Sequence, residues 1–351
     1  MSGMEAAGTK SSSEALSTFT ATPSADNTAT TGTTRAILSP LLADGTYDLS
    51  YIGILIAACG ALCTTAPVLY NRAPGSGLAI RTVPADCEAY FGDDVFLRDG
   101  HGQPVAPKEI PSEYRAEFTL DGVMAVHEQY YDEHFVENTH DVNWWTEEAV
   151  NDLVAQARAG KLHGGYGRRE TENLRFALGL TAAATIAGKR VLVIGSQKPW
   201  VEACVLEAGA AEVVTLEYGD IVSTHPKIKT MTPGVFRDRY HDGSLGLFDA
   251  VATFSSVEHS GLGRYGDALN PWGDVLEIAR AWCVTKPGGS LTIAVPEDKN
   301  IDKVNWNAHR FFGKFRYPYL TTNWAATWIH PMSGMGQGQV ANNFVKVGDQ
   351  Q

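Results

Sequence analysis

The chain has 351 residues, of which 44% are hydrophobic and 10% aromatic, enough for one large or two ordinary globular domains. Its 28 basic and 40 acidic residues give a formal charge of −12. Nucleic acids are held mainly through clusters of Lys and Arg, and the absence of such a run argues against a nucleic-acid substrate. The five cysteines contain no CxxC pair, so we expect buried, reduced thiols and predict no metal site.

The N-terminal part divides into two segments of contrasting composition. Residues 1–48 are rich in Ser, Thr, Ala and Gly, which cannot bury enough apolar surface to order a chain, and we predict a disordered tail. Residues 49–70 contain no charged side chain, and their length suits a bilayer core. We therefore predict a single-pass membrane protein, with a buried core helix or a soluble hairpin as the alternative. Orientation and compartment stay open, because the flanking basic residues are balanced.

Residues 71–142 combine many aromatic side chains with Gly, Pro and Asp turn signals, and we expect an irregular lead-in that packs on the main domain. Helical signals follow. Thr146 with two acidic residues after it is typical of a helix start, and the helix should end at Gly160. A second helix is expected over 170–187, after an unusually Gly-rich loop at 163–170.

From Gly188 onward, short apolar runs alternate with helical segments. Strands are expected at 190–196, 212–218, 247–256, 290–296, 324–329 and 343–347. Helices are expected at 199–210 and 272–284, with a KPGG turn before the fourth strand. This alternation is typical of a parallel sheet with crossover helices. We therefore predict one Rossmann-like α/β domain over residues 143–351.

Ligands of such sheets bind at the carboxyl ends of the strands, where strand order reverses. The first strand ends in Gly195, Ser196 and Gln197 immediately before a helix, and Glu217 ends the second strand 22 residues after the glycine. A carboxylate at this distance can accept hydrogen bonds from a ribose diol. Tyr218 would lie against the base. The chain lacks GxGxxG, which argues against NAD, although NAD and S-adenosylmethionine (AdoMet) share the ribose.

The distal half carries a resemblance to known proteins. FDAVATFSSVEHSGLGRYGD, then a helix, KPGG and a strand, resembles class I AdoMet methyltransferases. VIGSQKPWVEACVLEAGAAEVVTLEY, SSVEHSGLGRYGDALNPWGD and NAHRFFGKFRYP are similar to domain-of-unknown-function family 268, over about residues 110–347. The resemblance implies a methyltransferase-like fold with AdoMet as cofactor, and Ser255 at the end of the third strand is counted among the cofactor contacts. The first strand departs from the class I pattern, since it lacks the usual acidic residue and the GxGxG loop.

The polar block that follows the third strand is the candidate catalytic segment, because it is longer than a structural connection needs to be. Glu258 or His259 would remove a proton from the acceptor, and Asp267 would orient the acceptor hydroxyl. The predicted substrate contacts are Arg264, Asn270, Asp274 and His309. The leading hypothesis is an AdoMet-dependent O- or N-methyltransferase for a small molecule or saccharide. The alternatives are an idle Rossmann-like domain that binds a nucleotide or a partner, and a nucleotide-sugar or NAD enzyme. The oligomeric state is not readable from the sequence.

Overall fold

The computed structural model describes residues 87–92, 106–120, 122–131, 142–265, 267–298, 301–313, 316–331, 333 and 339–347. The predicted tail at 1–48 and the predicted membrane segment at 49–70 lie outside these residues. Among the described residues, no helix combines the length and the apolar character that a bilayer crossing requires.

A seven-stranded sheet forms the centre of the fold, in the order β11-β12-β8-β7-β3-β4-β6. Its strands are β3 (Arg190–Ile194), β4 (Glu212–Leu216), β6 (Ile228–Met231), β7 (Phe248–Phe254), β8 (Thr285–Ala294), β11 (Trp324–Trp328) and β12 (Asn342–Lys346). The five strands from β6 to β8 are parallel, and β12 runs antiparallel to both of its neighbours. Strand order reverses between β3 and β7, which is where an α/β sheet of this kind opens a ligand crevice.

The strands form where the sequence has uninterrupted apolar runs, as expected for a sheet covered on both faces. Four consecutive residues of β3, Val191 to Ile194, are buried. The KPGG segment differs from its prediction as a turn, because it lies within β8. The register between β7 and β8 shifts there, and Gly288 has φ +74°, so the segment is an irregularity inside a long strand.

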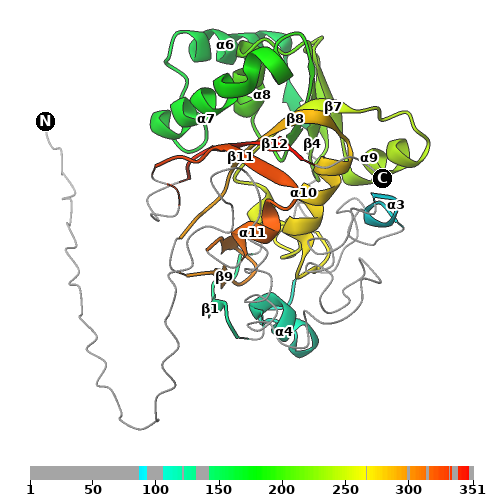
Figure 1. The fold of residues 1–351 in the computed structure, drawn as a ribbon, viewed down its shortest axis with the longest axis vertical. Coiled ribbons are helices and arrows are strands. Elements are labelled where there is room, and N and C mark those ends of the chain that lie inside the picture. Colours follow the sequence, from blue (N-terminus) through cyan, green and yellow to red (C-terminus); the bar gives the residue numbers. More distant parts are fainter. Residues whose placement is uncertain are drawn as a thin grey trace, which may run out of the picture. The chain divides into compact units, whose positions relative to one another are not determined.

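Helices cover both faces of the sheet (Figure 1). On one face lie α6 (Glu147–Arg158), α7 (Arg168–Thr181), which continues as a π-helical turn over Ala182–Ile186, and α8 (Trp200–Glu207). On the other face lie α9 (Pro233–His241) and α10 (Gly273–Cys283). Each face has its own apolar cluster. The predicted cap of α6 is confirmed, since the Thr146 hydroxyl accepts a hydrogen bond from the Ala149 amide at 3.2 Å.

The described part of the lead-in is built of short elements: α3 (Cys87–Tyr90), α4 (Ser112–Thr119) and β1 (Ala125–His127). Strand β1 pairs with β9 (Lys303–Asn305), which pairs with β10 (His309–Phe311). A second small ladder joins β2 (Asn143–Trp145) to β5 (Ile221–Ser223). The remaining elements are a 3₁₀ turn over Val257–His259 and α11 (Tyr317–Leu320). The fold is therefore the predicted α/β Rossmann-like sheet of the class I methyltransferase type with an irregular N-terminal lead-in.

A disulfide bond joins the lead-in to the main domain. It connects Cys87 in α3 to Cys283 at the end of α10, 196 residues later in the chain. The prediction of reduced thiols is wrong for this pair, because spacing in a sequence carries no signal for a bond over such a separation. Cys204 is a free, buried thiol as expected. Cys59 and Cys63 lie outside the described residues.

Candidate functional site

A cleft of 380 Å³ opens at the carboxyl ends of β3, β4 and β7. Its size is in the range of small-molecule and cofactor sites, and it lies at the reversal of strand order. It is lined by Gly165, Tyr166, Gly195, Ser196, Gln197, Lys198, Trp200, Glu217, Tyr218, Phe254, Ser255, Ser256, His259, Ser260, Tyr265 and Asp267. All six residues predicted to contact the cofactor are therefore brought together in one cleft.

The loop after β3 is fixed by its neighbours. Gly195 has φ +73°, and a Cβ added there would lie 1.8 Å from the Ser256 hydroxyl, so only glycine fits. The Ser196 amide donates to Glu217 Oε2 at 2.8 Å, and the Ser196 hydroxyl donates to Glu202 Oε2 at 2.9 Å. Because the amide and the hydroxyl of Ser196 already form hydrogen bonds within the protein, the exposed Gln197 is better placed than Ser196 to contact a ligand.

Glu202 is a functional candidate that the sequence reasoning missed. It is fully buried in the first turn of α8, where it accepts hydrogen bonds from the hydroxyls of Ser196 and Thr215. Burial raises its pKa to about 7 despite these bonds. From the sequence alone, a glutamate in the first turn of a helix is interpreted as a residue whose charge interacts favourably with the helix dipole. Only the structure shows that this one lies beneath the cleft loop and supports it.

Glu217 connects two strand ends. Its Oε1 accepts from the Tyr218 amide at 2.7 Å, and its Oε2 accepts from the Ser196 amide. Burial raises the pKa of Glu217, and the backbone hydrogen bonds oppose this shift. A carboxylate offers about four acceptor positions, so Glu217 retains capacity for a ligand hydroxyl at the cleft wall.

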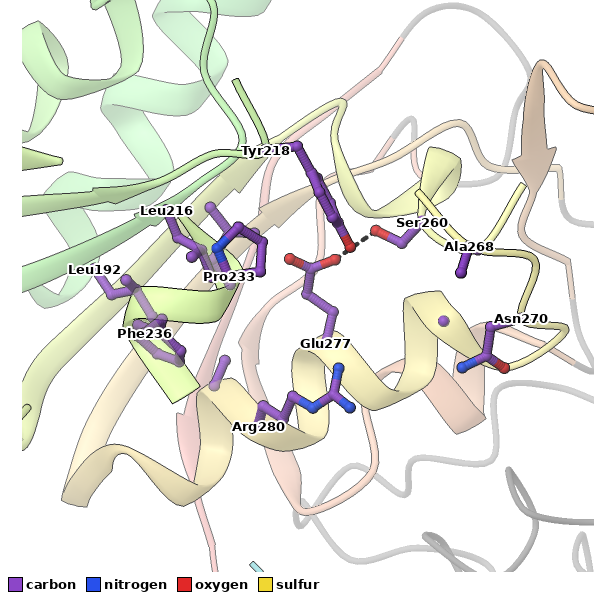
Figure 2. Close-up of a pocket in the computed structure, with 14 residues that line it drawn as sticks. Leu192, Leu216, Tyr218, Pro233, Phe236, Ser260, Ala268, Asn270, Glu277 and Arg280 are labelled. Carbon is purple, nitrogen blue, oxygen red and sulfur yellow. Dashed lines mark hydrogen bonds between the residues drawn. The ribbon is translucent and has the colours of Figure 1, made fainter. Parts of the chain in front are cut away.

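A small inner pocket shares Tyr218 and Ser260 with the cleft. Figure 2 shows the residues that line this inner pocket. Its volume of 30 Å³ has room for about two water molecules. The Ser260 hydroxyl donates to Glu277, and burial raises the pKa of Glu277 to about 7. Asn270, predicted as a substrate contact, lines this inner pocket rather than the cleft. Its Nδ2 is buried with no hydrogen-bond partner in the described part of the chain.

Glu258 lies in the 3₁₀ turn after β7, next to His259, which lines the cleft. Its side chain is 1% exposed, and burial raises its pKa to about 7. Its Oε1 accepts from the Ser255 hydroxyl at 2.6 Å and from Gln339 Nε2 at 3.1 Å. Ser255 itself has φ +51°, an uncommon conformation for a residue with a side chain.

His259 is neutral in this environment. Its Nδ1 lies 2.6 Å from the Ala308 carbonyl oxygen, so Nδ1 carries the hydrogen and Nε2 is an acceptor. Burial lowers its pKa to about 3, and its Nε2 lies 3.7 Å from Glu258 Oε1. A group that weakly basic is a poor proton acceptor near pH 7, where a general base works best with a matched pKa. Of the two candidate bases, the structure therefore favours Glu258.

Tyr166 enters the cleft from the Gly-rich loop at 163–170, to which the sequence reasoning assigned no role. A Cβ at Gly164 would lie 2.3 Å from the Trp200 ring, so the loop packs directly on the start of α8. The Tyr166 ring lies 5.3 Å from that of Phe254, and its hydroxyl donates to the Ser255 hydroxyl at 2.6 Å. The clustering of glycines was the available signal, because it permits close approach of the backbone.

Asp267, the third predicted catalytic residue, is buried at the cleft wall and organises the loop. Its Oδ2 accepts from the amides of Gly261 and Gly263, at 2.6 and 3.3 Å. Burial raises its pKa, and these amide bonds oppose the shift. Because both amides donate to its carboxylate, Asp267 stabilises the conformation of the loop that contains Gly261 and Gly263.

Arg264 and His309, two of the predicted substrate contacts, lie beyond the residues that line the cleft. The Arg264 guanidinium lies over the Tyr131 ring at 4.7 Å and donates to the Ala308 carbonyl at 3.3 Å. The His309 ring lies 6.1 Å from that of His259, and burial lowers its pKa to about 4. Both surround His259 without lining the cleft themselves.

Asp274, also predicted as a substrate contact, is fully buried away from the cleft lining. Its carboxylate forms a bidentate ion pair with Arg316, at 2.6 and 2.8 Å. Arg310, next to this pair, donates to the backbone carbonyls of Ser260 and Asn270. The burial of Asp274 has a physical reason. A buried carboxylate needs a buried cation, and the aromatic-flanked arginines near residue 310 supply it.

The profile of a family described as "Caenorhabditis protein of unknown function, DUF268" matches residues 188–343. The resemblance predicted from the sequence is confirmed for this segment, which is shorter than the predicted range of about 110–347. The matched segment contains β3 to β8 and most of the cleft. No curated protein matches the chain by sequence.

Several solved structures are similar to the described fold at low identity. A 1,6-didemethyltoxoflavin-N1-methyltransferase from Burkholderia thailandensis has 15% identity and a TM-score of 0.37, over 57% of this chain and 87% of that one. A putative hemolysin from Streptococcus thermophilus has 14% identity and a TM-score of 0.35, over 53% and 69%. The N-methyltransferase NodS from Bradyrhizobium japonicum WM9 has 13% identity and a TM-score of 0.33, over 51% and 95%.

Proposed function

We propose that this protein is an AdoMet-dependent methyltransferase that acts on a hydroxyl or amino group of a small molecule or saccharide. The observation that carries the proposal is one cleft served by two carboxyl groups in different environments. Glu217, hydrogen-bonded to backbone amides at the end of β4, is suited to hold a ribose. Glu258, buried at the end of β7 with its pKa raised to about 7, is suited to receive a proton.

The residues of the cleft fit the cofactor. Glu217 would accept hydrogen bonds from the ribose diol, Tyr218 would contact the base, and Gly195 would let the loop approach the cofactor closely. Exposed Gln197 supplies polar contacts at the other end. When bound, AdoMet supplies a methyl group on a positively charged sulfur. Glu202 would support the loop from below, in place of the acidic residue that is missing from β3.

The protein's own contribution to the reaction is to position the acceptor and to remove its proton. Neutral His259 offers an acceptor lone pair on Nε2 beside Glu258. Aromatic rings of Tyr166, Trp200 and Phe254 form one wall of the cleft, where they exclude water and can pack on a ring of the acceptor. Near neutral pH, Glu258 can change its protonation state during turnover because its pKa lies close to the pH.

Isothermal titration of the purified protein with AdoMet, its demethylated product and NAD tests the cofactor. We expect both AdoMet and the product to bind and NAD not to bind. Transfer of labelled methyl from AdoMet into an extract of small molecules then tests the reaction. Binding of AdoMet without any transfer would favour an idle domain, and binding of NAD in its place would favour an oxidoreductase or a nucleotide-sugar enzyme.

We also propose that residues 49–70 hold the protein on a membrane. The support is the 22-residue uncharged run, long enough for a bilayer core. Alkaline carbonate extraction of the full chain, compared with a chain that begins at Asn71, tests this. Release of the full chain into the soluble fraction would contradict the anchor.

A further inference from the structure

We propose that Tyr166, Ser255 and Glu258 form a proton relay, in which the Tyr166 hydroxyl takes the acceptor's proton and Ser255 passes a proton on to Glu258. The relay deepens the proposed methyltransferase function and rests on it. It assigns a role to the Gly-rich loop at 163–170 and makes Tyr166 the group that touches the acceptor.

The hydrogen bonds of the three residues all point the same way. The Tyr166 hydroxyl donates to Ser255 Oγ at 2.6 Å, and Ser255 Oγ donates to Glu258 Oε1 at 2.6 Å. Both distances are at the short end of the range for hydroxyl donors. A chain of donors with one direction lets each oxygen accept a proton on one side as it gives one up on the other.

Burial differs sharply between Tyr166 and Glu258, the two ends of this series of hydrogen bonds. Tyr166 is 48% exposed and lines the cleft, whereas Glu258 is 1% exposed and does not line it. A carboxyl group that is so deeply buried cannot meet an acceptor directly. A base at that position needs an intermediary. Tyr166 is the exposed end of the series of hydrogen bonds that leads to Glu258.

Gln339 fixes the direction of the middle member. Its Nε2 donates to Ser255 Oγ at 2.8 Å and to Glu258 Oε1 at 3.1 Å. A serine hydroxyl has two acceptor lone pairs and one donor hydrogen. Tyr166 and Gln339 occupy both lone pairs, so the hydrogen of Ser255 is left for Glu258. The φ of +51° at Ser255 places this hydroxyl between strand end and loop.

The protonation states of the two ends agree with this direction. Burial raises the pKa of Tyr166, the hydrogen bond to Ser255 lowers it, and the charge on Glu258 raises it, with a net increase. Tyr166 therefore remains protonated near pH 7 and cannot act as a base alone. Burial raises the pKa of Glu258 to about 7, so its carboxylate is available to receive the proton.

The transfer balances as follows for a hydroxyl acceptor. The acceptor oxygen forms a bond to the methyl carbon while the bond from that carbon to sulfur breaks, and the electron pair stays on sulfur. The acceptor's proton moves to Tyr166 Oη, the Tyr166 proton moves to Ser255 Oγ, and the Ser255 proton moves to Glu258 Oε1. No oxidant or additional reactant is required.

The first test needs no acceptor. Infrared difference titration of the protein bound to the demethylated cofactor, with Glu258→Gln as the blank, isolates the carboxyl band of Glu258. Ser255→Ala should raise the Glu258 midpoint by about one pH unit or more, because it removes a hydrogen bond to the carboxylate. Tyr166→Phe should raise it less, in the same direction, through polarisation of Ser255. A midpoint unchanged in Tyr166→Phe would overturn the relay whatever the activity.

The second test uses methyl transfer. Tyr166→Phe and Glu258→Gln should each lower kcat by roughly a hundredfold or more and leave AdoMet affinity within about threefold. Ser255→Ala should lower kcat to a similar extent. The double variant Tyr166→Phe/Glu258→Gln should be no slower than either single variant, since groups that act as a unit are not additive. The matched control is Tyr240→Phe, which removes an exposed tyrosine hydrogen bond to Glu88 in α3 and should keep full activity.

The outcomes separate the relay from the function on which it rests. If Glu258→Gln is slow while Tyr166→Phe retains the wild-type rate, the relay is overturned and the methyltransferase proposal stands. If the wild type binds the demethylated cofactor but transfers no methyl group to any acceptor, the function fails, and the infrared midpoints still decide whether Tyr166 and Ser255 are coupled to Glu258.

Discussion

Replacing Asp274 by Asn should destabilise the protein severely without acting through substrate binding. Asp274 and Arg316 are both fully buried and form a bidentate ion pair, with Arg310 Nε 3.7 Å from the same carboxylate. Loss of the charge leaves two buried guanidinium groups without their anion. Breaking such a pair costs about 3–5 kcal/mol in the free energy of unfolding. In a domain of this size that is roughly 6–20 °C in Tm.

Urea unfolding followed by tryptophan fluorescence measures the loss. Asp238→Asn, in an exposed pair with Arg237, is the matched control and should cost within about 1 kcal/mol. Burial would raise the pKa of Asp274, but Arg310 and Arg316 together hold it below its ordinary value. The stabilisation is therefore fully present above the ordinary aspartate pKa and is lost as the pH falls through the lowered one. If Asp274→Asn unfolds at the wild-type urea concentration but transfers methyl groups slowly, Asp274 contacts substrate after all.

Glu217→Ala should weaken AdoMet binding about tenfold to several hundredfold in calorimetry, because hydrogen bonds to a charged group contribute roughly 1.5–3 kcal/mol each, and wild-type affinity would refute the ribose assignment. The raised pKa of Glu258 means that its contribution to stability is present below the ordinary glutamate pKa and is lost as the pH rises through about 7. Glu258→Gln should therefore gain urea resistance relative to wild type between pH 5 and pH 8, and a constant difference would contradict the raised pKa. Reduction of the Cys87–Cys283 bond should lower the free energy of unfolding by about 2–5 kcal/mol, whereas a Cys204→Ser variant should respond to reduction as the wild type does.

The sheet could be predicted from the sequence because its strands are short apolar runs separated by helices, and periodicity of that kind is a local property. The edge strand β6, with the pattern Ile-Lys-Thr-Met, was not predicted. It is only partly buried, so its composition does not stand out from a loop. The helices at 147–158 and 168–181 carried clear capping and periodic signals.

The site was predictable only where function follows from position along a strand. Gly195, Glu217 and Ser255 end their strands, and strand ends meet at one edge of a parallel sheet. Tyr166 and Gln339 come to Ser255 from segments 89 and 84 residues away. Asp274 was interpreted as a substrate contact because a polar residue in a long loop looks accessible. Its partner Arg316 is 42 residues further along the chain, and no local pattern reveals that pairing.

The disulfide between α3 and α10 also has consequences for how the protein matures and for what happens when its chain is cut. Such bonds persist in oxidising surroundings and are rare in proteins bathed in glutathione. Formation of the Cys87–Cys283 bond therefore requires oxidising conditions. The bond also closes a covalent ring that contains β3, β4, β6 and β7, so a single cut in the chain between residues 93 and 105 would leave α3 attached to α10.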